Sequence, residues 1–117
     1  MISFINRFHG HGSLRYVYQN GEAFRSRLIT LKVIRNVHRK NSRIAVVVSK
    51  KVLKSAVGRN RIRRRVYEYI RLQLPSFKDV FDIVIIITSS DLLTLTYDEI
   101  ISQLSQILEQ ASITKTN

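Results

Sequence analysis

One basic segment constrains the fold of this chain more than any other part of its sequence. Nine of the residues from 50 to 71 are Lys or Arg, and Glu68 is the one acid among them. The apolar residues inside this segment recur at helical spacing: Ile62, Val66, Tyr69 and Ile70. The pattern predicts an amphipathic helix from about Ser55 to Leu72 that ends before Pro75. Its single apolar stripe would pack inward and leave arginines on the remaining directions.

The charge of the chain is concentrated in its first part. Residues 1–71 hold 18 Lys and Arg against two acids, a net charge of +16, whereas residues 72–117 hold two Lys against six acids, a net charge of −4; the two sum to +12. A small soluble domain normally carries a net charge of magnitude about 2–8. This asymmetry favours a polyphosphate partner, and therefore nucleic acid, over a solvated charged face or an anionic membrane surface.

Length and composition restrict the class of protein. A chain of 117 residues fits one domain, and we expect a single domain over 1–117 with a short flexible tail at 112–117. The absence of Cys excludes disulfides, thiolate zinc sites and cysteine nucleophiles. No apolar run approaches the about 20 residues of a membrane span, and the N-terminus lacks the features of a signal peptide. These observations indicate a cytoplasmic protein with no membrane partner.

The first half of the chain contains signals for a helix and two strands. Ser13 is a plausible N-cap for a short helix ending near Asn20, with Gly21 as a left-handed residue at its end. Alternating apolar residues predict a strand over Leu28 to Ile34, and a β-branched run predicts another over Arg43 to Ser49. We expect the polar and basic residues between these strands to form a hairpin-like loop.

The second half adds a strand and a helix. The run from Val80 to Thr88 is the most apolar of the chain, which predicts a central strand covered on both faces. The segment from Thr96 to Glu99 has the form of a capping box, followed by apolar residues at helical spacing. The predicted order is α-β-β-α-β-α. The fold class is therefore α+β, a single-domain α-β sandwich with helices packed on a small central sheet.

The basic helix and the strand before it resemble a known signature. Val48-Ser49-Lys50-Lys51 is followed about ten residues later by Arg59-Asn60-Arg61, a pattern similar to that of the protein subunit of bacterial ribonuclease P. Shorter pieces of the same family pattern are Asn6-Arg7-Phe8, Asp82-Ile83-Val84-Ile85 and Leu95-Thr96-Tyr97. The resemblance runs in order along about residues 6–110.

The resemblance implies a ribonucleoprotein endonuclease. In that family a large catalytic RNA subunit performs Mg²⁺-dependent removal of the 5′ leader from precursor tRNA, and the protein binds both this RNA and the leader. Catalysis is therefore expected in the RNA subunit, with no catalytic or metal-binding residue in this chain. The resemblance also implies a left-handed crossover at the basic helix, where general rules for such connections favour the right-handed form.

The resemblance assigns two sets of binding residues. Contacts with RNA fall on Lys50, Lys51, Lys54, Arg59, Asn60, Arg61, Arg63, Arg64 and Arg65, where guanidinium forks suit phosphate. A leader cleft between the first helix and the sheet would include Leu14, Tyr18 and Lys32. Leu14 stands where the family usually has Phe, and Lys32 lies near another usual aromatic position. We therefore expect weaker stacking and stronger electrostatics in this cleft.

Several alternatives remain at this stage. Tyr18 would serve either as a platform for an unpaired base or in simple packing. Asp82 would be either a buried acid or a residue at the strand start that reaches solvent or a basic partner. A metal site at His9 and His11 lacks a nearby carboxylate. A structural RNA-binding protein, such as a ribosomal protein, would share the charge and fold, whereas the strand-helix-strand setting argues against a DNA-binding module.

Overall fold

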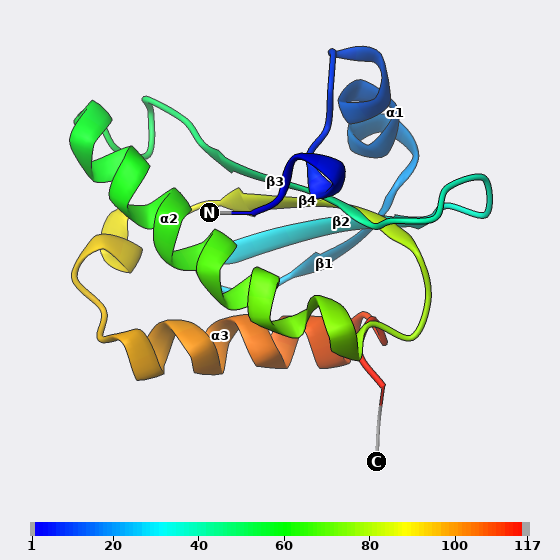
Figure 1. Cartoon of the computed structure of the whole chain (residues 1–117). Coiled ribbons are helices and arrows are strands. Elements are labelled where there is room, and N and C mark those ends of the chain that lie inside the picture. The colour runs from blue at the N-terminus through cyan, green and yellow to red at the C-terminus, as the bar shows by residue number, and fades with distance from the viewer. Residues whose placement is uncertain (1, 116–117) are drawn as a thin grey trace.

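The computed structural model of the chain describes residues 2–115, which form a four-stranded sheet and three α-helices (Figure 1). The helices are α1 (Gly12–Asn20), α2 (Ala56–Gln73) and α3 (Tyr97–Gln110). The strands are β1 (Glu22–Arg25), β2 (Ile29–Arg35), β3 (Arg43–Val48) and β4 (Phe81–Ile87). Short 3₁₀ turns, η1 (Phe4–Asn6), η2 (Leu74–Ser76) and η3 (Ser90–Leu93), complete the described chain. No helix among these residues is both long and apolar enough to span a membrane.

The sheet has the order β1-β2-β4-β3. β2 pairs antiparallel with both β1 and β4, whereas β3 pairs parallel with β4 and reaches it through α2. This is the strand-helix-strand crossover that the predicted order of elements implies, and its left-handed sense stays a prediction from the resemblance. The prediction of a hairpin-like loop between β2 and β3 is wrong, because β4 lies between them. β4 pairs with a strand on each side, and its side chains are buried on both faces of the sheet. Its continuous apolar run suits this central position.

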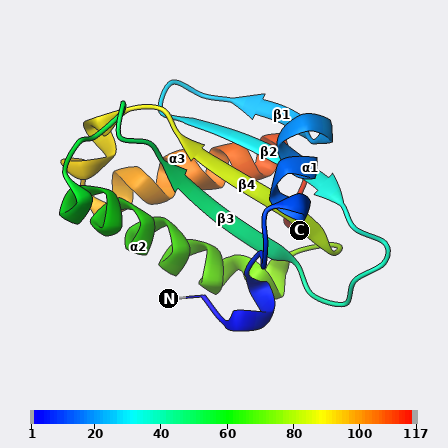
Figure 2. The same ribbon diagram turned by 90° about the horizontal axis from the view of Figure 1, so that it is seen from above.

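Helices cover both faces of the sheet. α2 and α3 lie on one face and α1 lies on the other, as the two views together show (Figures 1 and 2). Alternate residues of β2, β3 and β4 meet the apolar stripes of α2 and α3 in one hydrophobic core. The predicted stripe of α2 is buried throughout, with Ile62, Val66, Tyr69 and Ile70 at most 6% exposed. The α+β sandwich is therefore confirmed.

The caps of α2 and α3 follow the sequence closely. The Ser55 hydroxyl accepts a hydrogen bond from the Gly58 amide at 3.1 Å and begins α2. The Thr96 hydroxyl accepts from the Glu99 amide at 3.2 Å, as predicted for a capping box. Glu99 reaches back to the Thr96 hydroxyl at 3.0 Å, where the usual capping box uses the backbone amide.

The ends of α1 differ from the prediction. The helix begins at Gly12 after His11, so Ser13 lies within its first turn and is not the N-cap. Gly21 has φ −68°, an ordinary extended conformation, and the expected left-handed end is wrong. Space explains the glycine, because a Cβ atom at this position would lie 2.6 Å from the Val17 carbonyl oxygen.

Two further segments, β1 and the C-terminal residues 112–115, differ from the prediction. β1 has only four residues with no alternation of apolar and polar side chains, so its sequence carries no strand signal. The expected flexible tail is wrong for residues 112–115, because Ile113 is fully buried and the Lys115 amide donates to the Ser76 carbonyl at 2.7 Å. Residues 116 and 117 lie outside the described part of the chain.

Candidate nucleic-acid interface

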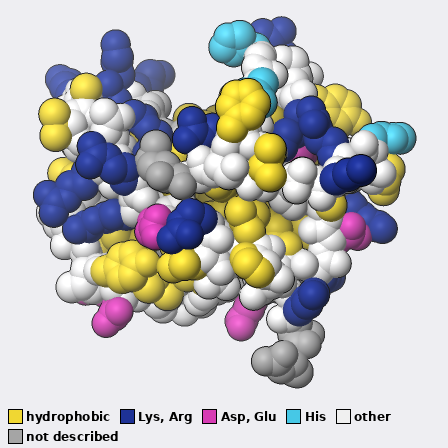
Figure 3. Space-filling view, viewed as in Figure 1, with side chains coloured by type: hydrophobic (Ala, Val, Ile, Leu, Met, Phe, Trp, Pro, Cys, Tyr) yellow, Lys and Arg dark blue, Asp and Glu magenta, His cyan; other side chains and the backbone are white. Residues whose placement is uncertain are grey.

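The predicted RNA-binding residues come together at one end of the molecule. Lys50, Lys51 and Lys54 are exposed in the segment that joins β3 to α2, and the arginines follow on the first turns of the helix. Lys and Arg side chains gather over this end of α2 in the space-filling view, whereas the few visible acidic side chains lie elsewhere (Figure 3). The first turn of α2 contains no acid. The positive end of the helix dipole therefore adds to the side-chain charge.

Two of these arginines donate hydrogen bonds to backbone carbonyl oxygens of neighbouring segments. Nη1 of Arg59 donates to the carbonyl oxygens of Leu53 at 3.0 Å and Lys54 at 2.8 Å, which fixes the segment before the helix. Nη1 of Arg65 donates to the Leu95 carbonyl at 3.1 Å and links α2 to the turn before α3. Each guanidinium keeps other N–H groups for a ligand, but both are half-buried and positioned by the protein.

The remaining arginines of this end are more available. The side chains of Arg61 and Arg64 are exposed and make no hydrogen bond or ion pair with any residue of the described chain. Arg63 donates to the Asn60 side-chain oxygen, which ties the two together. Farther along α2, Arg71 pairs with Glu68 at 2.6 Å, and this bond lowers the pKa of the Glu68 carboxyl. Along α2, the uncompensated charge therefore lies at the beginning of the helix.

The predicted cleft residues lie on the other face of the sheet, beside α1. Nζ of Lys32 donates to the Tyr18 carbonyl at 2.7 Å and stands 5.4 Å from the centroid of the Tyr18 ring. Burial raises the pKa of the half-buried Tyr18 hydroxyl. Leu14 lines a cavity of about 340 Å³ together with Phe8, Ala45 and others. The structure thus pairs Tyr18 with Lys32 and places Leu14 one turn earlier on α1.

α1 packs over β2 and β4 on this face of the sheet. The strand register puts Lys32, Val84 and Ala45 in one row across β2, β4 and β3. Val84 is fully buried, whereas Ala45 is half-buried. The Val84 side chain is therefore closed to a ligand, and Lys32 and Ala45 are the partly exposed ends of this row.

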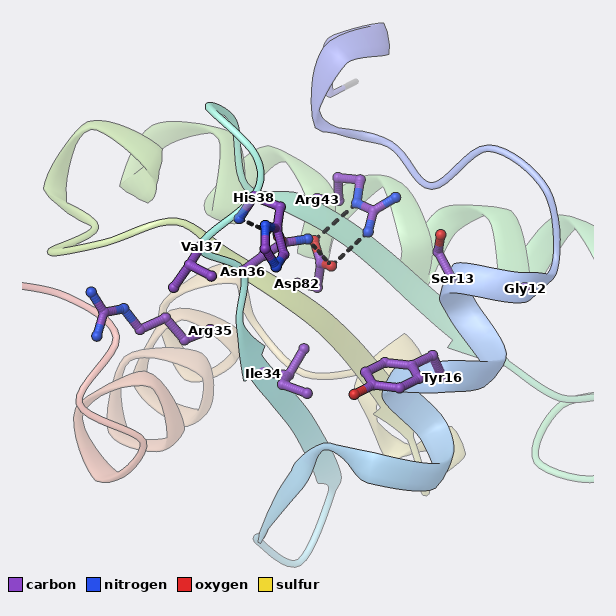
Figure 4. A pocket seen from close by; sticks show the side chains of 10 residues that line it. All are labelled: Gly12, Ser13, Tyr16, Ile34, Arg35, Asn36, Val37, His38, Arg43 and Asp82. Carbon is purple, nitrogen blue, oxygen red and sulfur yellow. Dashed lines mark hydrogen bonds and ion pairs between the residues drawn. The ribbon is translucent and has the colours of Figure 1, made fainter.

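A cavity of about 510 Å³ at the N-terminal end of α1 contains none of the predicted residues (Figure 4). A buried ion pair forms part of its wall. Nε and Nη2 of Arg43 donate to the two carboxylate oxygens of Asp82 at 2.9 and 2.6 Å, and the Asn36 amide donates to the same carboxylate at 2.8 Å. Asp82 is therefore both a buried acid and the partner of a base. The sequence did not indicate which base, because 39 residues separate the pair.

Acidic and histidine side chains are scattered over the structure. Within residues 2–115, no three His, Cys, Asp or Glu side chains lie close enough together to hold a metal ion. His9 bonds to the Phe4 carbonyl and stacks on the Phe4 ring, so it has a partner within the N-terminal segment. Glu99 belongs to the cap of α3.

Comparison with known proteins identifies the family. The Ribonuclease P family model matches residues 5–112. The ribonuclease P protein component of a Pseudanabaena species is 33% identical over 112 residues, which cover 96% of each chain. That of Clostridium botulinum is 36% identical over 109 residues, 92% of this chain and 96% of the relative.

Solved structures agree on the fold. The ribonuclease P protein of Staphylococcus aureus superposes with a TM-score of 0.84 at 23% identity, covering 94% of this chain and 98% of that one. The protein from Thermotoga maritima gives a TM-score of 0.78 at 21% identity, covering 89% and 96%. The chain therefore belongs to the ribonuclease P family, as a protein component of the holoenzyme that cleaves tRNA precursors.

Proposed function

We propose that the beginning of α2 binds the phosphate backbone of the catalytic RNA subunit. The observation that carries this proposal is the pair Arg61 and Arg64, exposed guanidinium groups with no partner within the described chain. Positive charges this close together repel one another, and the helix N-terminus beside them has no acid in its first turn. An anion that binds there relieves this repulsion. Lys50, Lys51 and Lys54 extend the same surface along the preceding segment.

The cleft beside α1 takes the unpaired leader of precursor tRNA in this proposal. The half-buried Tyr18 ring offers a surface for a base, and the Lys32 ammonium beside it offers a charge for a phosphate. Leu14 contributes apolar contact only, so this cleft has one aromatic platform on α1. Binding of the leader would therefore depend less on stacking and more on the charge of Lys32.

The catalytic chemistry lies in the RNA subunit. Mg²⁺ supplied there would neutralise the reacting phosphate and activate water. Residues of this chain would bind and orient the two RNAs, and their positive charge would lower the Mg²⁺ concentration that assembly requires. The substrate is precursor tRNA and not DNA, and the activity belongs in the cytoplasm, where bacterial tRNA is transcribed.

Cleavage of a precursor tRNA tests the whole proposal. A bacterial ribonuclease P RNA is incubated with precursor at low Mg²⁺, with and without the protein. We expect the protein to stimulate cleavage at the mature 5′ end. Binding of the RNA without any stimulation would favour a purely structural RNA-binding protein.

A further inference from the structure

A second basic surface lies apart from the beginning of α2. It is a cavity of about 400 Å³ between the N-terminal segment and the loop that joins β2 to β3. We call it the N-terminal basic pocket, and the residues that matter here are Phe4, Arg7, His9, His38, Arg39 and Lys40. No acidic side chain lines it. Its volume falls within the about 300–1,000 Å³ of small-ligand sites.

The cations of this pocket are largely uncompensated. Arg39 and Lys40 are exposed and make no ion pair or side-chain hydrogen bond with other described residues. Arg7 uses Nε and Nη2 to bind the Ile2 carbonyl at 3.0 and 2.8 Å, which leaves its charge unneutralised. Arg43 also lines the pocket, but Asp82 balances it. Three positive charges therefore face one cavity, as an anionic ligand requires.

An aromatic pair stands beside these charges. The rings of Phe4 and His9 stack with centroids 3.9 Å apart and an interplanar angle of 30°. A hydrogen bond of 2.9 Å between His9 Nε2 and the Phe4 carbonyl fixes this arrangement. Phe4 is nevertheless 71% exposed, so most of its ring is accessible. An exposed ring that is already oriented is suited to stacking on a flat ligand.

Both walls of the pocket are fastened to the sheet. The Asn36 side-chain oxygen accepts from the His38 amide at 3.0 Å, while its amide group binds the buried Asp82. The Asn6 side chain donates to the Ser42 carbonyl at 2.8 Å, and Arg7 bridges to Ile44 at the edge of β3. The pocket is therefore largely ordered before a ligand binds, which lowers the conformational entropy lost on binding.

We propose that the N-terminal basic pocket binds an unpaired ribonucleotide. Its base stacks on the Phe4–His9 pair, and its phosphate lies between Arg39 and Lys40. The neighbouring cavity of about 510 Å³ shares His38 and Arg43 with the pocket and adds the exposed ring of Tyr16, so the strand can continue there. Aromatic rings interleaved with arginine match single-stranded RNA better than an acidic protein segment.

This inference rests on the proposed function, that the chain binds RNA. The nucleotide would come from one of two sources with the same chemistry. It belongs either to the leader of the precursor, beyond the cleft beside α1, or to an unpaired part of the RNA subunit. Two binding assays distinguish these sources.

The test uses two pocket variants and one matched control. Phe4→Leu keeps an apolar side chain but removes the ring, and the double variant Arg39→Ser/Lys40→Ser removes two charges. The control Arg27→Ser/Lys115→Ser removes two exposed charges that do not line the pocket. Thermal unfolding of each variant verifies that the fold is retained. Affinity is measured for the RNA subunit, and for precursors with a short and a long leader on the reconstituted holoenzyme.

We expect both pocket variants to lower the affinity for at least one of these RNAs about fivefold or more. The control should change each affinity less than about twofold. A loss confined to the long-leader precursor assigns the nucleotide to the leader, and a loss for the RNA subunit assigns it to that RNA. Loss of affinity in the double variant alone, without an effect of Phe4→Leu, would overturn a stacked nucleotide and favour diffuse attraction or an acidic segment. Pocket variants that match the control would also overturn it.

Arg61→Ala separates this inference from the proposed function. If Arg61→Ala weakens binding of the RNA subunit while the pocket variants match the control, the inference fails and the proposed function stands. If Arg61→Ala and Arg64→Ala are both without effect as well, the proposed function itself fails.

Discussion

The backbone amide of Val46 donates a hydrogen bond to the Tyr67 hydroxyl at 3.0 Å. Val46 lies in β3, at the edge of the sheet, and is 5% exposed, so its amide would otherwise lack a partner. Tyr67 lies on α2, between the buried residues Val66 and Tyr69. A side chain of α2 therefore completes the backbone hydrogen bonding of β3, and this bond joins the helix to the edge strand of the sheet.

Tyr67→Phe should destabilise the protein by about 1–3 kcal/mol, because it leaves a buried amide without an acceptor. Tyr16→Phe is the matched control, since Tyr16 is 56% exposed and its hydroxyl should contribute less than about 0.5 kcal/mol. Urea denaturation of both variants measures the free energies of unfolding. Equal values for the two would show that the amide finds water or another acceptor.

Much of the fold could be read from the sequence because its signals are local. The stripe of α2 depends on side chains three and four apart, and the caps at Ser55 and Thr96 act within one turn. β4 was recognised as central from its continuous apolar run. The order of the strands could not be predicted in this way, because no local sequence signal specifies that β4 lies between β2 and β3. β1 could not be predicted, because a four-residue edge strand buries too few side chains to require alternating apolar and polar residues.

The candidate site was predictable in composition but not in detail. The density of arginine after residue 54 indicated a phosphate-binding helix, and the structure places these side chains together. Sequence could not tell that Arg59 and Arg65 bind backbone carbonyls while Arg61 and Arg64 bind nothing in the described chain. That difference depends on loops folded against the helix. The partner of Asp82 was hidden for the same reason, because Arg43 reaches it only through the parallel pairing of β3 and β4.

The buried pair of Arg43 and Asp82 gives a second prediction. Their side chains are 8% and 5% exposed, so Asp82→Asn leaves a guanidinium buried without its counter-ion. We expect a loss of about 3–5 kcal/mol in the free energy of unfolding. Asp91→Asn is the control, because its ion pair with Arg27 spans 3.7 Å at 73% and 60% exposure and should contribute about 0–1 kcal/mol. Similar urea midpoints for the two variants would contradict this account.

The unpartnered arginines of α2 give a third prediction. Arg61→Ala and Arg64→Ala should each weaken binding of the RNA subunit by about 1–3 kcal/mol and leave the unfolding free energy unchanged. Arg71→Ala is the control on the same helix, because Glu68 already pairs with Arg71. Fluorescence anisotropy with labelled RNA gives the affinities. Unchanged affinity in both test variants would exclude this surface from the RNA contact.

The pairing of Tyr18 with Lys32 leads to the last prediction. If the Tyr18 ring supports a base of the leader, Tyr18→Ala should weaken binding of a leader-bearing precursor by about 1–3 kcal/mol and leave binding of mature tRNA nearly unchanged. Tyr18→Phe keeps the ring and serves as the control, so it should bind both RNAs like the parent protein. The affinities are measured on the reconstituted holoenzyme at one salt concentration, because the charge of Lys32 makes them salt-dependent. Equal losses for precursor and mature tRNA would instead place Tyr18 in the packing of α1 against the sheet, where its half-buried ring already contacts Lys32.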